Sequence, residues 1–476
     1  MIRRRIAIAV LVSIPAMLPP AAAQAAALDG AELSWIWELP FIGILLSIAT
    51  GPLLFRKLWH DHYGKFTLGW SLMTLVPLAA FYGFATSWEA FVHAMLAEYL
   101  SFIVLLFALY TVAGGILVTG DLHGRPATNT AILGIGTLIA SVVGTTGAAM
   151  ILIRPLMRAN EDRAQNAHVF VFFIILAANV GGALTPLGDP PLFVGFLRGV
   201  DFFWTAQHLW LQTLIVAVWA LGLFYLVDRH FARRQRPREK GEAPTRVRIR
   251  GGVNFILIFG IVTVILMSGA WDPGISFDVS GTKVALQNLV RDVFLVGIAI
   301  ASLVLTPEEH RERNGFSWEP IREVAILFAG IFVAIIPVLA MLQAGPRGAF
   351  AGLLALITAP DGTPNDVAYF WLTGILSAFL DNAPTYLVFF ELAGGNAPQL
   401  MGPLAGTLSA ISMGAVYMGA LTYLGNAPNF MIYAIASERG IRMPSFFGYF
   451  LWACLILMPV LVLLTLLPIP PLWPGA

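Results

Sequence analysis

Residues 182–193 read GALTPLGDPPLF, and residues 419–430 read GALTYLGNAPNF. The two stretches align without gaps at an offset of 237 residues (182 to 419), and eight of the twelve positions are identical. Such repetition within one chain indicates a duplicated architecture. Glycine, proline and a polar residue inside an apolar segment predict a helix that is interrupted there, around Asp189 in the first copy and Asn426 in the second.

A second pair of segments precedes the two breaks at similar distances. Residues 126–157 and 367–398 are apolar at both ends, but their middles read GTTG and DNAP. Residues 141–146 align with residues 377–382 at an offset of 236 (141 to 377). Backbone of this kind lies at membrane depth only where protein or a wet cavity surrounds it. We therefore expect two re-entrant hairpins, each paired with one broken helix.

The composition indicates that the chain lies in a membrane. Hydrophobic residues make up 58% of the 476 and charged residues only 12%, whereas a soluble domain carries about 25% charged residues. The single cysteine excludes a disulfide framework and a cysteine metal cluster. The net charge of +1, with basic residues confined to short stretches, gives no support for binding nucleic acid.

Long apolar runs follow one another through the sequence. A span needs enough residues to cross about 30 Å of hydrocarbon, and eight runs satisfy this, near 33–54, 66–87, 97–118, 208–227, 253–270, 292–306, 321–342 and 445–468. The two broken helices, near 166–199 and 403–437, add two more crossings. The predicted fold class is an all-α polytopic membrane protein with two inverted repeats.

The amino-terminal residues 1–27 have three arginines before a short apolar stretch, and then alanines that offer an A-x-A cleavage site. This pattern predicts a bacterial signal peptide, with an uncleaved membrane helix as the alternative. A multi-pass protein with such a signal is expected in the bacterial inner (plasma) membrane, where the lipid bilayer is its main partner.

The basic residues predict how the chain is oriented. Lys and Arg gather after the first crossing, around the first hairpin and in the linker at 229–252. Counting crossings from an external amino terminus places all three in the cytoplasm, which agrees with the positive-inside rule. We therefore expect a first transmembrane repeat at 28–228, a basic cytoplasmic linker at 229–252, and a second, inverted repeat at 253–476.

Two aspartates stand far from any loop. Asp189 lies within the first break and Asp381 at the tip of the second hairpin, although an aspartate near the bilayer centre costs roughly 2.5–3.5 kcal/mol. Each could cap a half-helix, or bind a transported Na⁺ in competition with a proton. Exposed carbonyls and five polar side chains are the expected further ligands: Asn179, Asn382, Asn426, Thr185 and Thr422.

Other polar residues near the membrane segments call for a simpler interpretation. Glu98, at the head of a long helix, and His168 are expected to anchor the chain at the interface. The sequence has no H-E-x-x-H metalloprotease motif and no GxxxxGK phosphate loop. Neither a resident cofactor nor an ATP-driven pump is therefore expected.

The stretches NVGGALTPLGDPP (179–191), SAFLDNAPT (377–385) and LGNAPN (424–429) resemble the ion transporter superfamily. The resemblance is greatest to its NhaD-type sodium/proton antiporter and citrate transporter branch. It implies an elevator-type carrier, often a homodimer, whose ion-binding residues correspond here to Asn179, Asp189, Asp381, Asn382 and Asn426. Antiporters of this type tend to have an acid–amide pair at the first hairpin tip, where this chain has Thr145 and Thr146.

The main functional hypothesis is secondary transport that exchanges Na⁺ for H⁺ by alternating access, without an enzymatic reaction. A carrier of a citrate-like organic anion is the alternative, in which half-helix amino ends and hydroxyl groups hold carboxylates. An intramembrane hydrolase that uses the two aspartates is a remote third hypothesis. The Gly-x-Gly-Asp context associated with such enzymes is missing around Asp189 and Asp381.

Overall fold

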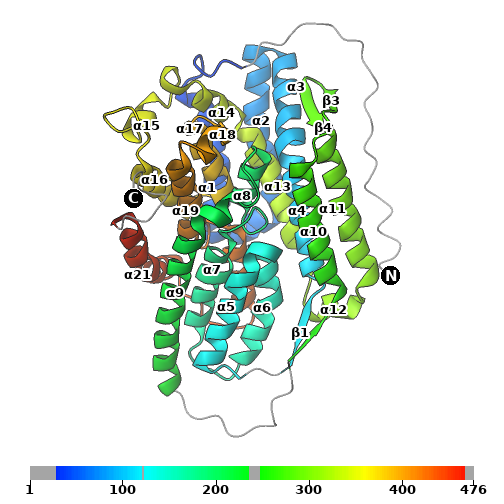
Figure 1. The fold of residues 1–476 in the computed structure, drawn as a ribbon, viewed down its shortest axis with the longest axis vertical. Helices are drawn as coiled ribbons and strands as arrows, with labels where there is room; N and C mark the ends of the chain where they lie inside the picture. The colour runs from blue at the N-terminus through cyan, green and yellow to red at the C-terminus, as the bar shows by residue number, and fades with distance from the viewer. Residues whose placement is uncertain (1–27, 121–122, 235–246, 467–476) are drawn as a thin grey trace.

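The computed structural model describes residues 28–120, 123–234 and 247–466. This part of the chain is almost entirely helical (Figure 1). Seven of its helices are long and apolar enough to cross a membrane, and a bent helix pair brings the number to eight if its two helices are counted as one span. The predicted all-α polytopic membrane fold is therefore confirmed. The predicted signal peptide at 1–27 lies outside the described residues.

One group of helices occupies the right and upper parts of Figure 1. It comprises η2 (Trp35–Glu38), α1 (Leu39–Leu54), α2 (Arg56–Tyr82), α3 (Phe84–His93), the π-helical η3 (Ala94–Tyr99), α4 (Leu100–Ala113), α10 (Val253–Ala270), α11 (Leu286–Leu305), α12 (Glu308–Arg313), α13 (Glu319–Ala334), α14 (Ile336–Gln343), η5 (Gly345–Arg347) and α15 (Ala351–Leu356). We call α3, η3, α4, α10, α11 and α13 of this group the framework.

The remaining helices contain the predicted hairpins and breaks. They are α5 (Pro126–Val143), α6 (Thr145–Ala159), α7 (Ala167–Ala177), η4 (Val180–Gly182), α8 (Pro190–Leu197), α9 (Trp204–Arg233), α16 (Asp366–Phe379), α17 (Asn382–Leu392), α18 (Ala397–Met401), α19 (Ala405–Met418), η6 (Gly419–Leu421), α20 (Ala427–Glu438) and α21 (Phe446–Leu466). We call α5–α8 and α16–α20 the core.

Two predicted crossings have different boundaries in the structure. The run predicted at 66–87 ends earlier, because α2 stops at Tyr82 and Gly83 turns the chain with φ of 91°. Positive φ is a conformation that glycine adopts without a steric penalty. The next span is therefore Phe84–Ala113 and not 97–118. The run predicted at 321–342 consists of α13 and α14, which bend by 42° just before Pro337.

The two predicted hairpins are turns between pairs of helices. The helix α5 ends at Val143 and α6 begins at Thr145, with Gly144 between them. The helix α16 ends at Phe379, and α17 begins at Asn382. In Figure 1 the pair α5 and α6 lies in the lower part of the molecule, whereas α16 and α17 lie at the upper left.

The backbone hydrogen bonds at the hairpin tips show which residues of the two repeats correspond. The Thr145 amide donates to the Gly188 carbonyl at 2.8 Å, and the Asn382 amide donates to the Gly425 carbonyl at 3.2 Å. Both atoms of this pair recur 237 residues later (145 to 382, 188 to 425). The second tip therefore needs no inserted residue, and Asn382 matches Thr145, not Thr146 as the ungapped sequence alignment predicted.

The two breaks are also matched in their backbone contacts. The Thr185 hydroxyl donates to the Ser141 carbonyl, and the Thr422 hydroxyl donates to the Ala378 carbonyl. A Cβ atom on Gly188 would overlap the Gly182 carbonyl oxygen, and a Cβ atom on Gly425 would overlap its counterpart in the second break. Glycine is needed at both places because the backbone on either side of each break approaches so closely.

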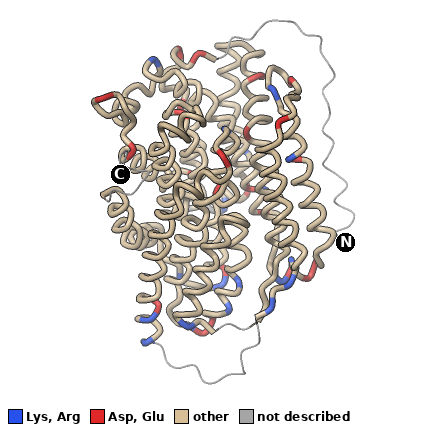
Figure 2. The backbone as a smooth tube through the Cα atoms, in the orientation of Figure 1, with Lys and Arg blue, Asp and Glu red and all other residues tan. Residues whose placement is uncertain are grey.

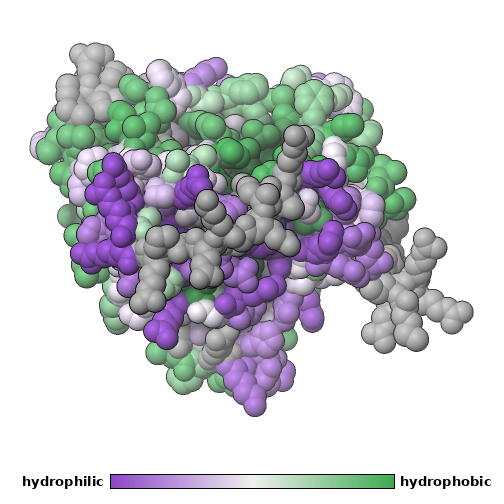
Figure 3. Space-filling model, turned by 90° about the horizontal axis from the view of Figure 1, so that it is seen from below, coloured by the Kyte–Doolittle hydropathy of each residue, from purple (hydrophilic) through white to green (hydrophobic). Residues whose placement is uncertain are grey.

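Two short sheets lie outside the helices. The strand β1 (Leu117–Thr119) pairs antiparallel with β2 (Arg248–Arg250), and β3 (Ser276–Val279) pairs antiparallel with β4 (Thr282–Ala285). Lys and Arg gather at the lower end of the molecule (Figure 2), where the view from below shows hydrophilic side chains beside a hydrophobic flank (Figure 3). Of the predicted linker at 229–252, residues 235–246 lie outside the described residues.

Candidate functional site

A cavity separates the framework from the core. It encloses about 800 Å³, its mouth included. The framework contributes α4 and α13 to its wall, and the core contributes the two hairpin tips and the two breaks. The polar and charged residues that line it are Tyr110, Thr145, Thr146, Asp189, Asp381 and Asn426. The elements that the sequence singled out therefore meet around one space.

Asp189 is the centre of the hydrogen bonds beside this cavity. Its side chain is buried, and only 1% of the residue is exposed. The Thr145 hydroxyl donates to Oδ1 at 3.1 Å, the Asn426 amide to Oδ1 at 2.8 Å, and the Asn382 amide to Oδ2 at 2.6 Å. Both hairpin tips and the second break thus supply one donor each to a carboxylate that the first break carries.

Asn426 extends these contacts into a chain of asparagine side chains. Its amide nitrogen also lies 3.3 Å from Asn179 Oδ1, and Asn179 in turn donates to Asn429 Oδ1 at 2.7 Å. Asn429 then donates to the carbonyls of Gly419 at 2.9 Å and Thr422 at 3.0 Å. Asn179, as predicted, lies at the site, but it is held by other side chains on both sides.

The sequence interpretation missed Asn429. At the offset of 237 residues this asparagine replaces Leu192 of the first break, and it is fully buried. A polar residue where the repeat has a leucine is the signal that could have identified it. Since buried amides need partners, its two bonds to carbonyls of the break explain why it is there.

Asp381 caps α17 and faces the cavity. Its Oδ1 accepts a hydrogen bond from the Ala383 amide at 3.2 Å, which is the capping role that the sequence left open. The residue is half-buried and lines the same cavity as Asp189. Asn382, next to it, is fully buried, and its Oδ1 has no hydrogen-bond partner among the described residues.

The two threonines at the breaks that were predicted to be ligands use their hydroxyl groups in hydrogen bonds to the backbone of the hairpins. Thr185 gives its hydroxyl proton to the Ser141 carbonyl. Thr422 gives its proton to the Ala378 carbonyl and accepts from the Leu424 amide at 3.0 Å. Thr145 and Thr146, by contrast, both line the cavity at the first tip. The hydroxyls at the tip are therefore better placed for a ligand than those at the breaks.

The charges around the cavity are of one sign. Among the described residues that line it, Asp189 and Asp381 are charged, and none is Lys, Arg or His. Four half-helices, α6, α8, α17 and α20, begin at this space, and the amino end of a helix carries partial positive charge. The two carboxylates thus lie among partial positive charges from the backbone.

The described residues contain no group of three or more His, Cys, Asp or Glu side chains that could hold a metal ion. The oxygens at the cavity include those of two carboxylates, the hydroxyls of the first tip and backbone carbonyls, and the amide oxygen of Asn382 is buried behind Asp189 and Asp381. This set matches the oxygen preference of a hard cation that is carried and released.

Comparison with known proteins places this site in context. A family model with the description "Putative citrate transport" matches residues 30–469. A transporter of Mycobacterium bovis and one of Mycobacterium tuberculosis, both called uncharacterized, are each 23% identical over 335 residues, which cover 67% of this chain and 71% of the relative. These names describe transport and give the hydrolase hypothesis no support. The chain is thus a multi-pass membrane transporter, and it belongs to this citrate transport family.

Proposed function

We propose that this transporter exchanges Na⁺ for H⁺ by alternating access across a bacterial inner membrane. The observation that carries the proposal is the charge of the cavity. Two aspartates, and no basic side chain among the described residues, line a space between the framework and the core. A cation neutralises these carboxylates, whereas an organic anion that binds without a cation is repelled by their negative charge.

The exchange itself follows from the hydrogen bonds of Asp189. Three donors hold the carboxylate in place when it is ionised, and burial favours its neutral, protonated form. A Na⁺ ion that binds at the same oxygens displaces the proton, and a returning proton displaces the ion. One carboxylate can therefore load either cation, but not both together.

Alternating access requires the site to face each side of the membrane in turn. The hairpins α5–α6 and α16–α17 lie in different parts of the molecule (Figure 1), which supports two repeats of opposite orientation. In this proposal the core moves along the framework as an elevator and carries Asp189 and Asp381 with it. The basic lower end (Figure 2) is the cytoplasmic side. A homodimer, in which the frameworks meet, is part of the same proposal.

Transport of a citrate-like organic anion is the second candidate, and one observation favours it besides the family description. The residue before α6 is Gly144, which has no side chain, and no side chain caps the amino end of this helix. The amino end of this helix therefore faces the cavity beside Thr145 and Thr146. Such an end, together with hydroxyl groups, binds carboxylates.

Proteoliposomes that contain a trapped pH indicator separate the two candidates. An inward Na⁺ or Li⁺ gradient should make the interior of wild-type vesicles alkaline, and a K⁺ gradient should not. The Asp381→Asn variant keeps the cap on α17, because an amide oxygen still accepts from Ala383, but it loses a titratable group. We expect its exchange to fall roughly a hundredfold or more.

The matched control for this experiment is Asp361→Asn, since Asp361 is an exposed aspartate in a loop. This variant should exchange Na⁺ for H⁺ at the wild-type rate. Uptake of labelled citrate without any cation-dependent pH change would instead assign the protein as an anion carrier and would overturn the antiport proposal.

A further inference from the structure

A second buried charge cluster lies away from the cavity. It consists of Glu98, Arg198 and Glu391. The two glutamates are 8% and 4% exposed, although Glu98 was expected to be an interfacial anchor. The prediction was wrong because the helix that carries Glu98 packs against the core at this point. A buried charge in a membrane segment is retained only where it is paired or has a function.

One guanidinium serves both carboxylates of this cluster. Arg198 lies 2.6 Å from Glu98 Oε1 through one terminal nitrogen and pairs with Glu391 through the other. The Gln343 amide donates to the second oxygen of Glu391 at 3.3 Å. Glu391 therefore accepts hydrogen bonds from two side chains. Glu98, by contrast, is connected to the core through Arg198.

The cluster and the cavity lie at opposite ends of the same two half-helices. The helix α8 begins next to Asp189 at the cavity and is followed at its other end by Arg198. The helix α17 begins beside Asp381 and has Glu391 in its last turn. Eight helical residues span only about 12 Å. A shift of either rigid half-helix at the cavity therefore displaces the cluster as well.

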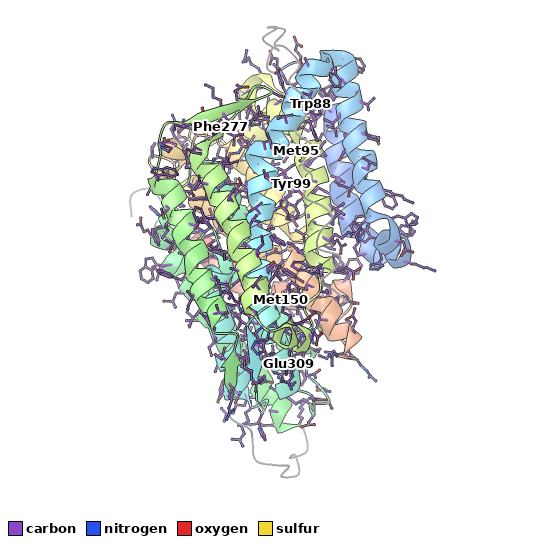
Figure 4. The ribbon with its side chains drawn as sticks, turned by 90° about the vertical axis from the view of Figure 1, so that its right-hand side faces the viewer. Trp88, Met95, Tyr99, Met150, Phe277 and Glu309 are labelled. Atoms are coloured by element: carbon purple, nitrogen blue, oxygen red, sulfur yellow. The ribbon has the colours of Figure 1, made fainter. Side chains whose placement is uncertain are left out.

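Glu98 comes from the framework and not from the core. It belongs to η3, the π-helical segment that joins α3 to α4, and the following helix α4 forms a wall of the cavity through Leu105, Leu109 and Tyr110. Figure 4 shows Met95 and Tyr99 of this segment midway along the helix whose upper end carries Trp88. Single π-helical turns within α-helices frequently mark functional positions.

We propose that the Glu98–Arg198 pair is the contact by which η3 holds the core in the conformation seen here, and that this pair must separate for the core to move. The proposal rests on the alternating-access mechanism proposed above. Glu98 is thus a positioning residue, which acts through Arg198 on α8. When the pair separates, the charge of Arg198 is still balanced by Glu391, because Glu391 moves with Arg198 in the core.

Electron paramagnetic resonance distances test the proposal without any transport assay. Native Cys454 is replaced by Ser, and spin labels are attached at Lys283→Cys, in β4 beside the framework, and at Gln399→Cys, in α18 of the core. Both side chains are exposed. Removal of a contact made in one conformation shifts the equilibrium toward the others, so Glu98→Gln should raise the population with a changed label distance roughly threefold or more.

Glu98→Gln is the informative variant, because it keeps the Arg198–Glu391 pair. Replacement of Arg198 would instead leave two buried carboxylates without a counter-charge. The matched control is Glu312→Gln, an exposed glutamate in α12, which should leave the distances unchanged. Unchanged distances in Glu98→Gln would overturn the proposal.

The same samples separate this proposal from the proposed function. If wild type exchanges Na⁺ for H⁺ but Glu98→Gln keeps the wild-type distances, the positioning role fails and the antiport stands. If the distances shift as expected while no cation-dependent pH change occurs in wild type, the positioning role stands and the antiport fails.

Discussion

The two hairpin tips have matched backbone contacts and different side chains. At both tips the first amide of the second helix donates to a glycine carbonyl of the neighbouring break, Gly188 or Gly425. The side chains beside these amides are Gly144 and Thr145 at the first tip, and Asp381 and Asn382 at the second. Because the backbone holds each tip to its break, the side chains at the two tips can differ without loss of this contact.

The backbone also explains why the first tip has no acid–amide pair. Gly144 matches Asp381 as the residue before the second helix, and its φ is 80°. An aspartate rarely adopts that conformation. Asp381 has φ of −63°, which is an ordinary conformation for an aspartate. The departure from the antiporter pattern therefore accompanies a different backbone conformation at the first tip.

The bases of the hairpins differ as well. At the first base, Asp228 of α9 lies 2.5 Å from Arg163 and 2.8 Å from His168, and accepts from Asn129 at 3.0 Å. In the second hairpin, Asp366 accepts from Thr407 at 2.6 Å. The first base thus has a network of charged groups, whereas the carboxylate at the second base is bound by one hydroxyl group.

The largest expected effect comes from the glycines that the two breaks share. Gly188→Ala and Gly425→Ala should each prevent folding, because a Cβ atom would overlap a backbone carbonyl that cannot move aside. Size-exclusion chromatography of the detergent-solubilised protein checks this. Gly222→Ala, in α9, is the control, because a Cβ atom there meets nothing within 4 Å. A monodisperse Gly188→Ala variant would show that the breaks are not held by this close approach.

The next largest effect is expected at the bases of the two hairpins, at Asp228 and Asp366. Asp228→Asn should lower the free energy of unfolding by about 3–5 kcal/mol, since it leaves the buried Arg163 without its carboxylate partner. Asp366→Asn should lower it by only about 1 kcal/mol, because one hydroxyl bond changes. Unfolding in a denaturing detergent measures both. Equal losses would contradict the difference between the bases.

The smallest effect concerns the threonines of the two breaks. Thr185→Val and Thr422→Val should each lower the free energy of unfolding by about 1 kcal/mol, since each removes a hydrogen bond to a hairpin carbonyl. The Na⁺ concentration for half-maximal exchange should stay within about threefold of the wild-type value. A much larger rise would restore these threonines as cation ligands, as the sequence predicted.

The positions of the breaks and tips could be predicted because glycine, proline and polar residues interrupt apolar periodicity, and the repeat presents that signal twice. The register of the tips was wrong by one residue because a sequence does not show which backbone hydrogen bonds recur in the two repeats. Asn429 was missed because its role depends on Asn179, which lies 250 residues away along the chain.

The partners of isolated polar residues could not be predicted either. Glu98 and His168 were expected at the interface, but the structure buries both and pairs them with Arg198 and Asp228. Such pairs form between residues 60 to 100 positions apart, so that only the packing of helices brings them together. Apolar periodicity shows which helices are buried, but not which neighbours they have.

Asp189 and Asn426 occupy equivalent positions in the two breaks, but only Asp189 can bind and release a proton. This difference is the basis of the functional account. The Asp189→Asn variant should fold with near-normal thermal stability. An amide oxygen at 189 can still accept from Asn426 and Thr145, and the buried Oδ1 of Asn382, which has no partner among the described residues, can turn to accept from the new amide nitrogen.

Proton release on Na⁺ binding tests the central claim most directly. Calorimetric titrations of purified wild type and Asp189→Asn, in two buffers with different heats of ionisation and at several pH values, count the protons released as Na⁺ binds. Wild type should release protons and bind Na⁺ more tightly as the pH rises, whereas Asp189→Asn should release fewer protons and lose most of that pH dependence. Full proton release with an unchanged pH profile in Asp189→Asn would contradict the account.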